Sequence, residues 1–450
     1  MDKTIQTLAR LASETSCKNL PNEAVHEAKR RIIDSIGCAA VASPYPFCAK
    51  IRTVATRYDG QPSARIWGSD IRTSVEMAAF ANGVMIRYLE LNDTVLAKSA
   101  GHPSDMIGGL VSLAEGIEAD GPALLAAVVV AYEAYCGLCA SVALQPSHLD
   151  QGLCAALGTA AGASLLLGLS HEEAVHALAL ALTPNMPLYN VRHGVLSDWK
   201  ACAGPNGVRN GLFAALLARD GVTGPAEAFA GKAGLFDVVG EFDFELGAGP
   251  GLHIASTHVK FYPVCYHGQS AVDAAIRLHG DGVPVDAIDD IHIETYQAAV
   301  DAMADERGKW TPTTRETADH SLPFTVAVSL MKGQLAADDY EERQLVDAGT
   351  VALMEKVRVS PSPEMTADYP RSAQTRITVR GSNGKSYEAL QEVPRGNAAN
   401  PLDDIDLEQK LRSLYPAGAG DQVTRLLEVA WSLEECGKVA ALVDAIGKFE

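Results

Sequence analysis

One apolar stretch, residues 124–144, restricts the possible folds of this chain more than any other feature of its sequence. It reads LLAAVVVAYEAYCGLCASVAL and is nearly long enough to cross a bilayer, which takes about 20 apolar residues. Glu133 lies inside it, with glycine and serine interspersed, and such residues suit a lipid-exposed helix poorly. We therefore expect a helix buried in the core of a large helical body, and no contact with a membrane.

Helical patterns fill the chain up to about residue 265. In NEAVHEAKRRIIDSIGCAAVA the apolar residues recur at helical spacing, which predicts a helix with Asn22 as its N-cap. Ser170 and Glu173 have the spacing of a capping box ahead of another helix. NGVRNGLFAALLAR predicts a helix that starts near Asn206. Several of these segments are apolar nearly all round, as expected where helices pack inside a large all-α body.

The pattern changes after about Gly268. AIDDIHIETY, KVRVS and QTRITVRG alternate apolar and polar residues and predict strands. Asn383 and Gly384 then precede another alternating segment, which predicts a β-hairpin. Helical patterns return from about Leu402. We expect a mostly α-helical protein with a large helical domain, built from residues 1–267 and 395–450, and a smaller α+β lid domain over residues 268–394.

The charge of the chain excludes several classes of partner. The formal net charge is -19, and no cluster of lysine and arginine of the kind that nucleic acid or anionic lipid needs is present, so these are not expected partners. Nine cysteines, an odd number with apolar neighbours, argue for reduced thiols and a cytoplasmic location. The first residues, MDKTIQTLARLASETS, lack the pattern of a secretory signal. A small anionic ligand would need the few cations gathered in one pocket.

Polar clusters interrupt the apolar helices. The first is LNDTVLAKSAGHPSD, which brings Asp93, Lys98 and His102 into a loop between two helices, the first of which is expected to continue through Leu91. A loop mounted on rigid helices suits reacting groups. The alternative is that the polar residues only cap the next helix, at Asp105 or its neighbour, and that the histidine is solvated.

Three further clusters follow along the chain. YNVRHGVLSDWKACAGPNG contains Lys200 among apolar neighbours, where it is either a desolvated base or a surface lysine. STHVKFYPVCYHGQSA offers Lys260, Tyr262 and His267 where the helical body meets the second domain. TRETADHSLPF holds His320 directly after Asp319, for which the alternative role is that of a helix N-cap only. No HExxH or GxSxG motif and no paired histidine spacing is present, so chemistry without metal or cofactor is the simplest expectation.

These four clusters, in this order, resemble the MmgE/PrpD family, and the resemblance covers essentially the whole chain. It implies a large helical domain made from both chain ends, an α+β lid, a homodimer, and catalysis without metal or organic cofactor. It also implies a small anionic carboxylate as substrate. Members of the family abstract a proton, or remove a carboxylate, beside a carboxylate group, which calls for cations and a tuned base.

The resemblance also assigns residues to the site. The reaction centre is expected to contain Asp93, His102, Lys200 and His267. Substrate binding is expected from Lys98, Lys260, Tyr262 and His320. Lys200 or His102 would move the proton, and His267 would act on the opposite face of the substrate.

Three departures from the family's dehydratase pattern lie beside these positions. Glu90-Leu91 stands where Asp-Phe or Asp-Tyr is typical, Asp198 replaces a methionine, and Cys265 ends a Pro-Val-Cys where Pro-Ala-Glu is common. They favour an isomerase, specifically an epimerase of a dicarboxylate of the iminodisuccinate type. The alternatives are a hydro-lyase of the 2-methylcitrate dehydratase type and a decarboxylase of the cis-aconitate type.

Overall fold

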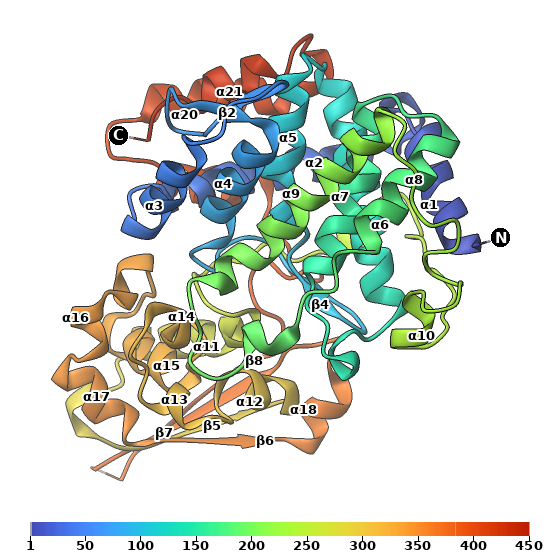
Figure 1. Cartoon of the computed structure of the whole chain (residues 1–450). Coiled ribbons are helices and arrows are strands. Elements are labelled where there is room, and N and C mark those ends of the chain that lie inside the picture. The colour runs from blue at the N-terminus through green and yellow to red at the C-terminus, as the bar shows by residue number, and fades with distance from the viewer. Residues whose placement is uncertain (1, 383, 450) are drawn as a thin grey trace.

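Helices account for 57% of the structure, and most of them form one large body to which a smaller lid is joined (Figure 1). The computed structural model describes residues 2–382 and 384–449. The predicted fold class, mostly α with a small α+β part, is confirmed. The helices of the body are α1 (Lys3–Glu14), α2 (Asn22–Ala42), α3 (Pro46–Ala55), α4 (Val75–Arg87), α5 (Ile107–Gly116), α6 (Gly121–Ser141), α7 (Gly152–Leu166), α8 (His171–Leu182), α9 (Trp199–Arg219), α10 (Leu235–Val239), α19 (Asp404–Leu414), α20 (Gly420–Trp431) and α21 (Ala440–Ile446).

The apolar stretch that opened the sequence forms α6 and lies in the middle of the body. Its length and mean hydropathy of 1.8 meet the requirement for a membrane span, yet 89% of that window is buried inside the protein. Glu133 is buried as well, and its carboxylate accepts hydrogen bonds from the backbone of Gly247 and His253. The neighbours of α6 in the body, among them α7 and α2, cover its faces. This is the environment of a core helix.

One apolar core unites the two ends of the chain in the body. Its side chains come from residues 5–259 and again from 402–449. A second core uses side chains from 264–389 and fills the lid. The helices of the lid are α11 (Gln269–Gly280), α12 (Gln297–Met303), α13 (Arg307–Trp310), α14 (Arg315–Ala318), α15 (Leu322–Lys332), α16 (Glu342–Leu345), α17 (Ala348–Met354) and α18 (Pro363–Asp368).

The lid is built on a four-stranded mixed sheet in the order β6-β5-β7-β8. Its strands are β5 (Ile288–Thr295), β6 (Val357–Pro361), β7 (Thr375–Gly381) and β8 (Ser386–Gln391). β5 pairs parallel with β6 and antiparallel with β7, and β7 pairs antiparallel with β8. All four predicted strands are present, although Asn383 of the predicted turn lies outside the described residues. The buried residues of β5 and β7 belong to the core of the lid, in which α11 packs against β7, β8 and α15.

Local predictions in the body were partly right. The capping box of Ser170 and Glu173 is present at the start of α8. Asn22, however, is the first helical residue of α2, and Pro21 is the N-cap. α9 begins at Trp199, seven residues before the predicted start at Asn206, because the helix runs through Pro205. Packing of α9 against α4, α7 and α8 outweighs the one hydrogen bond that the proline removes.

Body and lid also meet around one arginine of the lid. The Arg315 guanidinium lies over the rings of Tyr45 and Tyr88, which belong to the body, and over Tyr340 of the lid, at 5.0, 5.5 and 5.2 Å from the ring centres. Its Nη1 donates to the carbonyl of Ala337, whereas Nε and Nη2 have no hydrogen-bond partner among the described residues. The contact between the two parts therefore rests here on stacking rather than on ion pairs.

Candidate active site

A cavity of about 550 Å³ lies between body and lid. Body segments line one side, including the loop that follows α4, and lid segments around α12 line the other. Four of the residues expected at the site line this cavity, namely Lys98, His102, His267 and His320. The polar clusters that are far apart in the sequence therefore converge on one space.

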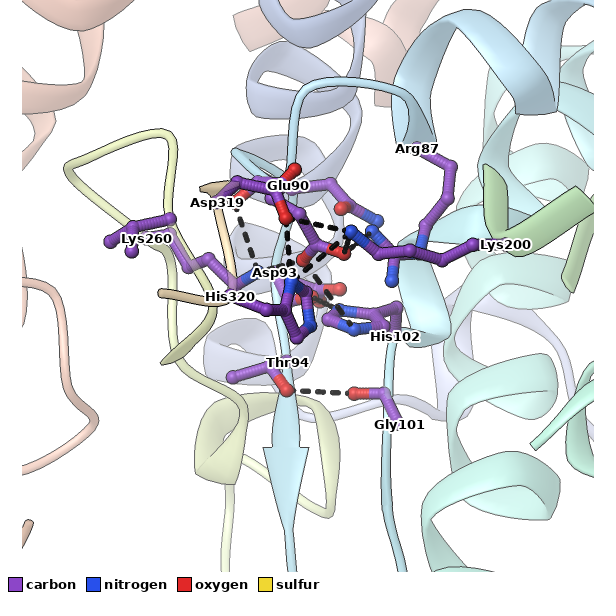
Figure 2. Close-up of polar contacts among 12 residues, drawn as sticks. Arg87, Glu90, Asp93, Thr94, Gly101, His102, Lys200, Lys260, Asp319 and His320 are labelled. Atoms are coloured by element: carbon purple, nitrogen blue, oxygen red, sulfur yellow. Dashed lines mark hydrogen bonds and ion pairs between the residues drawn. The ribbon is translucent and has the colours of Figure 1, made fainter. Parts of the chain in front are cut away.

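The loop after α4 is held rigidly where it enters the cavity. α4 ends at Arg87, not near Leu91 as predicted, and Glu90 adopts a positive φ of 54°. Thr94 then pairs with His258 in an antiparallel bridge, with backbone hydrogen bonds of 2.9 and 2.7 Å. The Thr94 hydroxyl donates to the carbonyl of Gly101 at 2.9 Å, which closes the small hairpin of β3 (Val95–Leu96) and β4 (Ala100–Gly101) (Figure 2).

Asp93 lies beneath the cavity and does not line it. Its carboxylate is fully buried and accepts hydrogen bonds from the Tyr132 hydroxyl and the Ser104 backbone N–H, both at 2.9 Å. Arg31 lies 3.5 Å away and supplies the opposite charge. These contacts make Asp93 an anchor for the loop that carries His102.

His102 has one ring nitrogen, Nε2, for which the described residues offer no hydrogen bond, and it lies 4.0 Å from Glu90 Oε2. Its Nδ1 lies 2.8 Å from the carbonyl of Asp93, and because a carbonyl only accepts, Nδ1 carries the proton. Burial and the charges of Arg87 and Lys260 lower the pKa of His102 well below its ordinary value, so the ring is neutral. Its backbone N–H is fixed by Gln151 at 2.6 Å. The result is an unprotonated Nε2 held in place at the cavity, which is what a general base requires.

Glu90 is the centre of a buried charge cluster. Its carboxylate lies 2.5 Å from Arg87 Nη1, 2.8 Å from Lys260 Nζ and 3.2 Å from Lys200 Nζ. The two lysines approach it from opposite sides (Figure 2). Burial acts to raise the pKa of Glu90, but the charges of Arg87, Lys260 and Lys200 outweigh it and hold the pKa well below its ordinary value. Glu90 is therefore an ionised carboxylate that holds three cations together.

Lys200 joins this cluster to the lid. It lies in the first turn of α9, is buried, and donates to Asp319 Oδ1 at 2.8 Å. The same oxygen of Asp319 lies 2.6 Å from Nδ1 of His320. Asp319 does not cap α15, since Ser321 does so. Lys200 does not line the cavity, and its contacts are those of a cation that positions two carboxylates rather than of a free base.

His267 reaches the cavity from the other side. Its Nδ1 lies 2.7 Å from the Tyr296 hydroxyl, and this tyrosine stacks on Tyr369. Burial raises the pKa of Tyr296 well above its ordinary value, so the phenol keeps its proton and can donate it to His267. Burial, assisted by the charges of His320 and Lys260, lowers the pKa of His267 to about 4. With Nδ1 accepting, the neutral ring carries its proton on Nε2 and can donate it.

The remaining predicted residues differ in their placement. Lys260 is completely buried against the carbonyl and the carboxylate of Glu90, outside the cavity lining. Lys98 lines the cavity with a side chain that is 56% exposed and contacts Glu245. Tyr262 does not line the cavity, and its hydroxyl donates to Asp273 at 2.7 Å. Substrate binding by these three residues remains a prediction.

Two arginines were not predicted as site residues. Arg87, at the end of α4, and Arg192 both line the cavity. Arg192 is held by a two-point contact with Asp150 at 2.7 and 3.2 Å. A charged residue at the end of an otherwise apolar helix, followed by a glutamate three residues later, was the available signal for Arg87. Guanidinium groups of this kind suit substrate carboxylates.

The chemistry that this arrangement supports is proton transfer beside a negatively charged group. His102 is placed to accept a proton, His267 is placed to donate one, and Arg87 and Arg192 bring positive charge to the same cavity. Within residues 2–382 and 384–449, no group of three metal-ligating side chains has the arrangement of a metal site.

Comparison with known proteins identifies one family over most of the chain. Residues 6–246 match the model of the MmgE/PrpD N-terminal domain, and residues 262–435 match that of the MmgE/PrpD C-terminal domain. The chain is 30% identical to the 2-methylcitrate dehydratase of Cupriavidus necator over 406 residues, which cover 84% of this chain and 83% of the relative.

Other relatives carry the same name. The 2-methylcitrate dehydratase of Escherichia coli K12 is 30% identical over 83% of this chain and 82% of its own length. The mitochondrial 2-methylcitrate dehydratase of Yarrowia lipolytica is 27% identical, over 82% and 74% respectively. These relatives favour the hydro-lyase alternative, and none of them supports the epimerase expected from the sequence. The chain belongs to the MmgE/PrpD family of enzymes.

Proposed function

We propose that this protein is a hydro-lyase that removes water from a small hydroxylated di- or tricarboxylate of the 2-methylcitrate type. The observation that carries the proposal is the pair of neutral histidines in one cavity, His102 with a free acceptor nitrogen and His267 with a donor nitrogen. Elimination of water needs both, because a proton leaves one carbon while a hydroxyl group leaves its neighbour. The names of the relatives support the same reaction.

The reaction follows from the positions of the polar groups. Arg87 and Arg192 bind substrate carboxylates, which fixes the substrate in the cavity. Nε2 of His102 takes the proton from the carbon beside a carboxylate, and the electron pair of the broken C–H bond forms the new double bond. The C–O bond breaks, and Nε2–H of His267 protonates the departing hydroxyl as water. Glu90 holds the surrounding cations in position throughout.

An epimerase would share the first step and differ in the second. It would return a proton to the same carbon from the opposite face, for which His267 is the available donor, and no water would leave. A decarboxylase would release carbon dioxide instead. Incubation with 2-methylcitrate in deuterated water separates the three reactions by mass and configuration of the product. We expect loss of water and a conjugated alkene; inverted configuration with deuterium uptake and no loss of mass would refute the hydro-lyase.

Two substitutions test the assigned roles. His102→Gln and His267→Gln preserve the size and the polar character of each side chain but remove its proton transfer, and each is expected to lower kcat by about 10²–10⁴-fold. His292→Gln is the matched control, because His292 lies on β5 against Ser360, outside the cavity lining. Full activity in either site variant would exclude that histidine from the reaction.

A homodimer is part of the same proposal. Four large apolar side chains between residues 188 and 213 are exposed: Leu188, Val195, Trp199 and Phe213. A second copy of the chain covering this segment would bury them. Phe213→Glu is expected to shift the protein towards the mass of a monomer in analytical ultracentrifugation, whereas Val346→Glu, at an exposed residue of the lid, leaves the mass unchanged.

A further inference from the structure

Cys265 lines the cavity but has no part in the reaction proposed above. It precedes the short helical turn that carries His267, and it is 9% exposed. It also stands where the dehydratase pattern of the family has a glutamate. A thiol at this position gives the cavity a nucleophile that the elimination of water does not need.

The neighbours of Cys265 form a chain of three side chains. Cys265 and His320 line the same cavity, and Nδ1 of His320 lies 2.6 Å from Asp319 Oδ1. The backbone N–H of Cys265 donates to the carbonyl of Asp319 at 3.0 Å, which fixes the distance between the two ends. Lys200 in turn holds the carboxylate of Asp319 at 2.8 Å. A nucleophile, a base and a group that orients the base are thus in sequence, which is the arrangement of an activated thiol.

The charges around the pair agree with this geometry. Burial acts to raise the pKa of Cys265, but the charge of His320 and its hydrogen bond outweigh burial and lower the pKa. Burial and Lys200 act to lower the pKa of His320, and Cys265 and Asp319 outweigh them and raise it. Buried cysteines elsewhere behave in the opposite way, since burial raises the pKa of Cys48 and that of Cys202 to about 12.

We propose that Cys265 is a nucleophilic thiol that adds to α,β-unsaturated carboxylates bound in the cavity and so blocks the site covalently. This proposal rests on the proposed function, whose product is an alkene beside carboxylate groups. His320 takes the proton from the Cys265 thiol, the Sγ–carbon bond forms at the β-carbon, and the π bond breaks towards the carbon beside the carboxylate. That carbon takes a proton from His320, so that thiol and alkene give a thioether without any oxidant. Arg87 and Arg192 draw the anionic alkene into the same cavity.

Fumarate serves as the probe, because it is the simplest unsaturated dicarboxylate. The full-length protein is incubated with fumarate or with succinate, its saturated counterpart, and peptides are mapped by mass spectrometry. We expect one fumarate adduct on Cys265, none with succinate, and none on Cys265 in Cys265→Ser. Cys17 and Cys436 are the more accessible thiols. Adducts confined to those two residues would overturn the proposal.

A second measurement separates activation from accessibility. Iodoacetate at neutral pH is expected to alkylate Cys265 about tenfold faster than Cys17, and His320→Gln is expected to remove this advantage. Equal rates in the parent protein and in a folded His320→Gln variant would refute activation by His320. This labelling needs no turnover: a protein that alkylates at Cys265 but does not dehydrate 2-methylcitrate refutes the proposed function alone. Dehydration without preferential labelling of Cys265 refutes the thiol proposal alone.

Discussion

Replacement of Glu90 by glutamine tests the buried charge cluster most directly. The cluster contains three cations, Arg87, Lys200 and Lys260, and two carboxylates, Glu90 and Asp319. Glutamine has nearly the same shape, so Glu90→Gln removes one charge and leaves packing unchanged. The remaining balance is three positive groups against one negative group, at sites that are at most 2% exposed.

The expected loss of stability follows from that imbalance. Removal of one partner from a buried ion pair costs about 3–5 kcal/mol, because the other charge stays buried without compensation. We therefore expect Glu90→Gln to lower the free energy of unfolding by about 3–5 kcal/mol in urea. Glu245→Gln is the matched control. Its partner Lys98 is 56% exposed, and such surface pairs contribute about 0–1 kcal/mol.

A double variant separates charge from other effects. Lys260→Met removes the cation closest to one oxygen of Glu90, and in combination with Glu90→Gln it restores the original net charge of the cluster. The double variant is expected to be more stable than Glu90→Gln alone. The reasoning is refuted if Glu90→Gln unfolds within about 1 kcal/mol of the parent protein, or if the second substitution adds its own full loss.

Two other predictions concern stability. His258 and His267 have pKa values lowered by burial from 6.5 to about 4, so the unfolded chain takes up protons first as the pH falls. Each histidine should therefore lower the free energy of unfolding by about 3 kcal/mol as the pH falls from 7 to 4. Urea unfolding across that range measures this, and a free energy of unfolding that does not change with pH contradicts it. Gly204→Ala would place a Cβ 1.9 Å from Asp105 Oδ2, and this clash should lower the melting temperature by the equivalent of about 1–3 kcal/mol. Gly280→Ala is the control, because open space surrounds Gly280 and the melting temperature should not fall. Equal melting temperatures of the two variants would refute the predicted clash.

The sequence was informative where structure is local. The strands of the lid and the capping box of α8 follow from side-chain alternation and from a spacing of three residues. α9 begins seven residues before the predicted start at Asn206, because packing inside the body carries the helix through Pro205. Here a tertiary effect outweighs a local one.

The candidate site was only partly predictable for the same reason. The histidines at 102, 267 and 320 stand out in polar clusters, and all three line the cavity. The partners of Glu90 come from residues 87, 200 and 260, and no local pattern indicates that three cations meet at one carboxylate. Tyr262 lies within a predicted cluster but points to Asp273, because position in the sequence does not fix the direction of a side chain.

The stacking of Arg315 and the ion pair of Lys200 join body and lid in different ways. A guanidinium is attracted to a ring face anywhere within about 6 Å of the ring centre, so the contacts of Arg315 with Tyr45 and Tyr88 fix the relative position of the two parts only loosely. The contact of 2.8 Å between Lys200 and Asp319 is a hydrogen-bonded ion pair, which fixes that position more closely. A substitution that breaks this ion pair would therefore loosen the wall of the cavity that carries His320, whereas the stacking of Arg315 would remain.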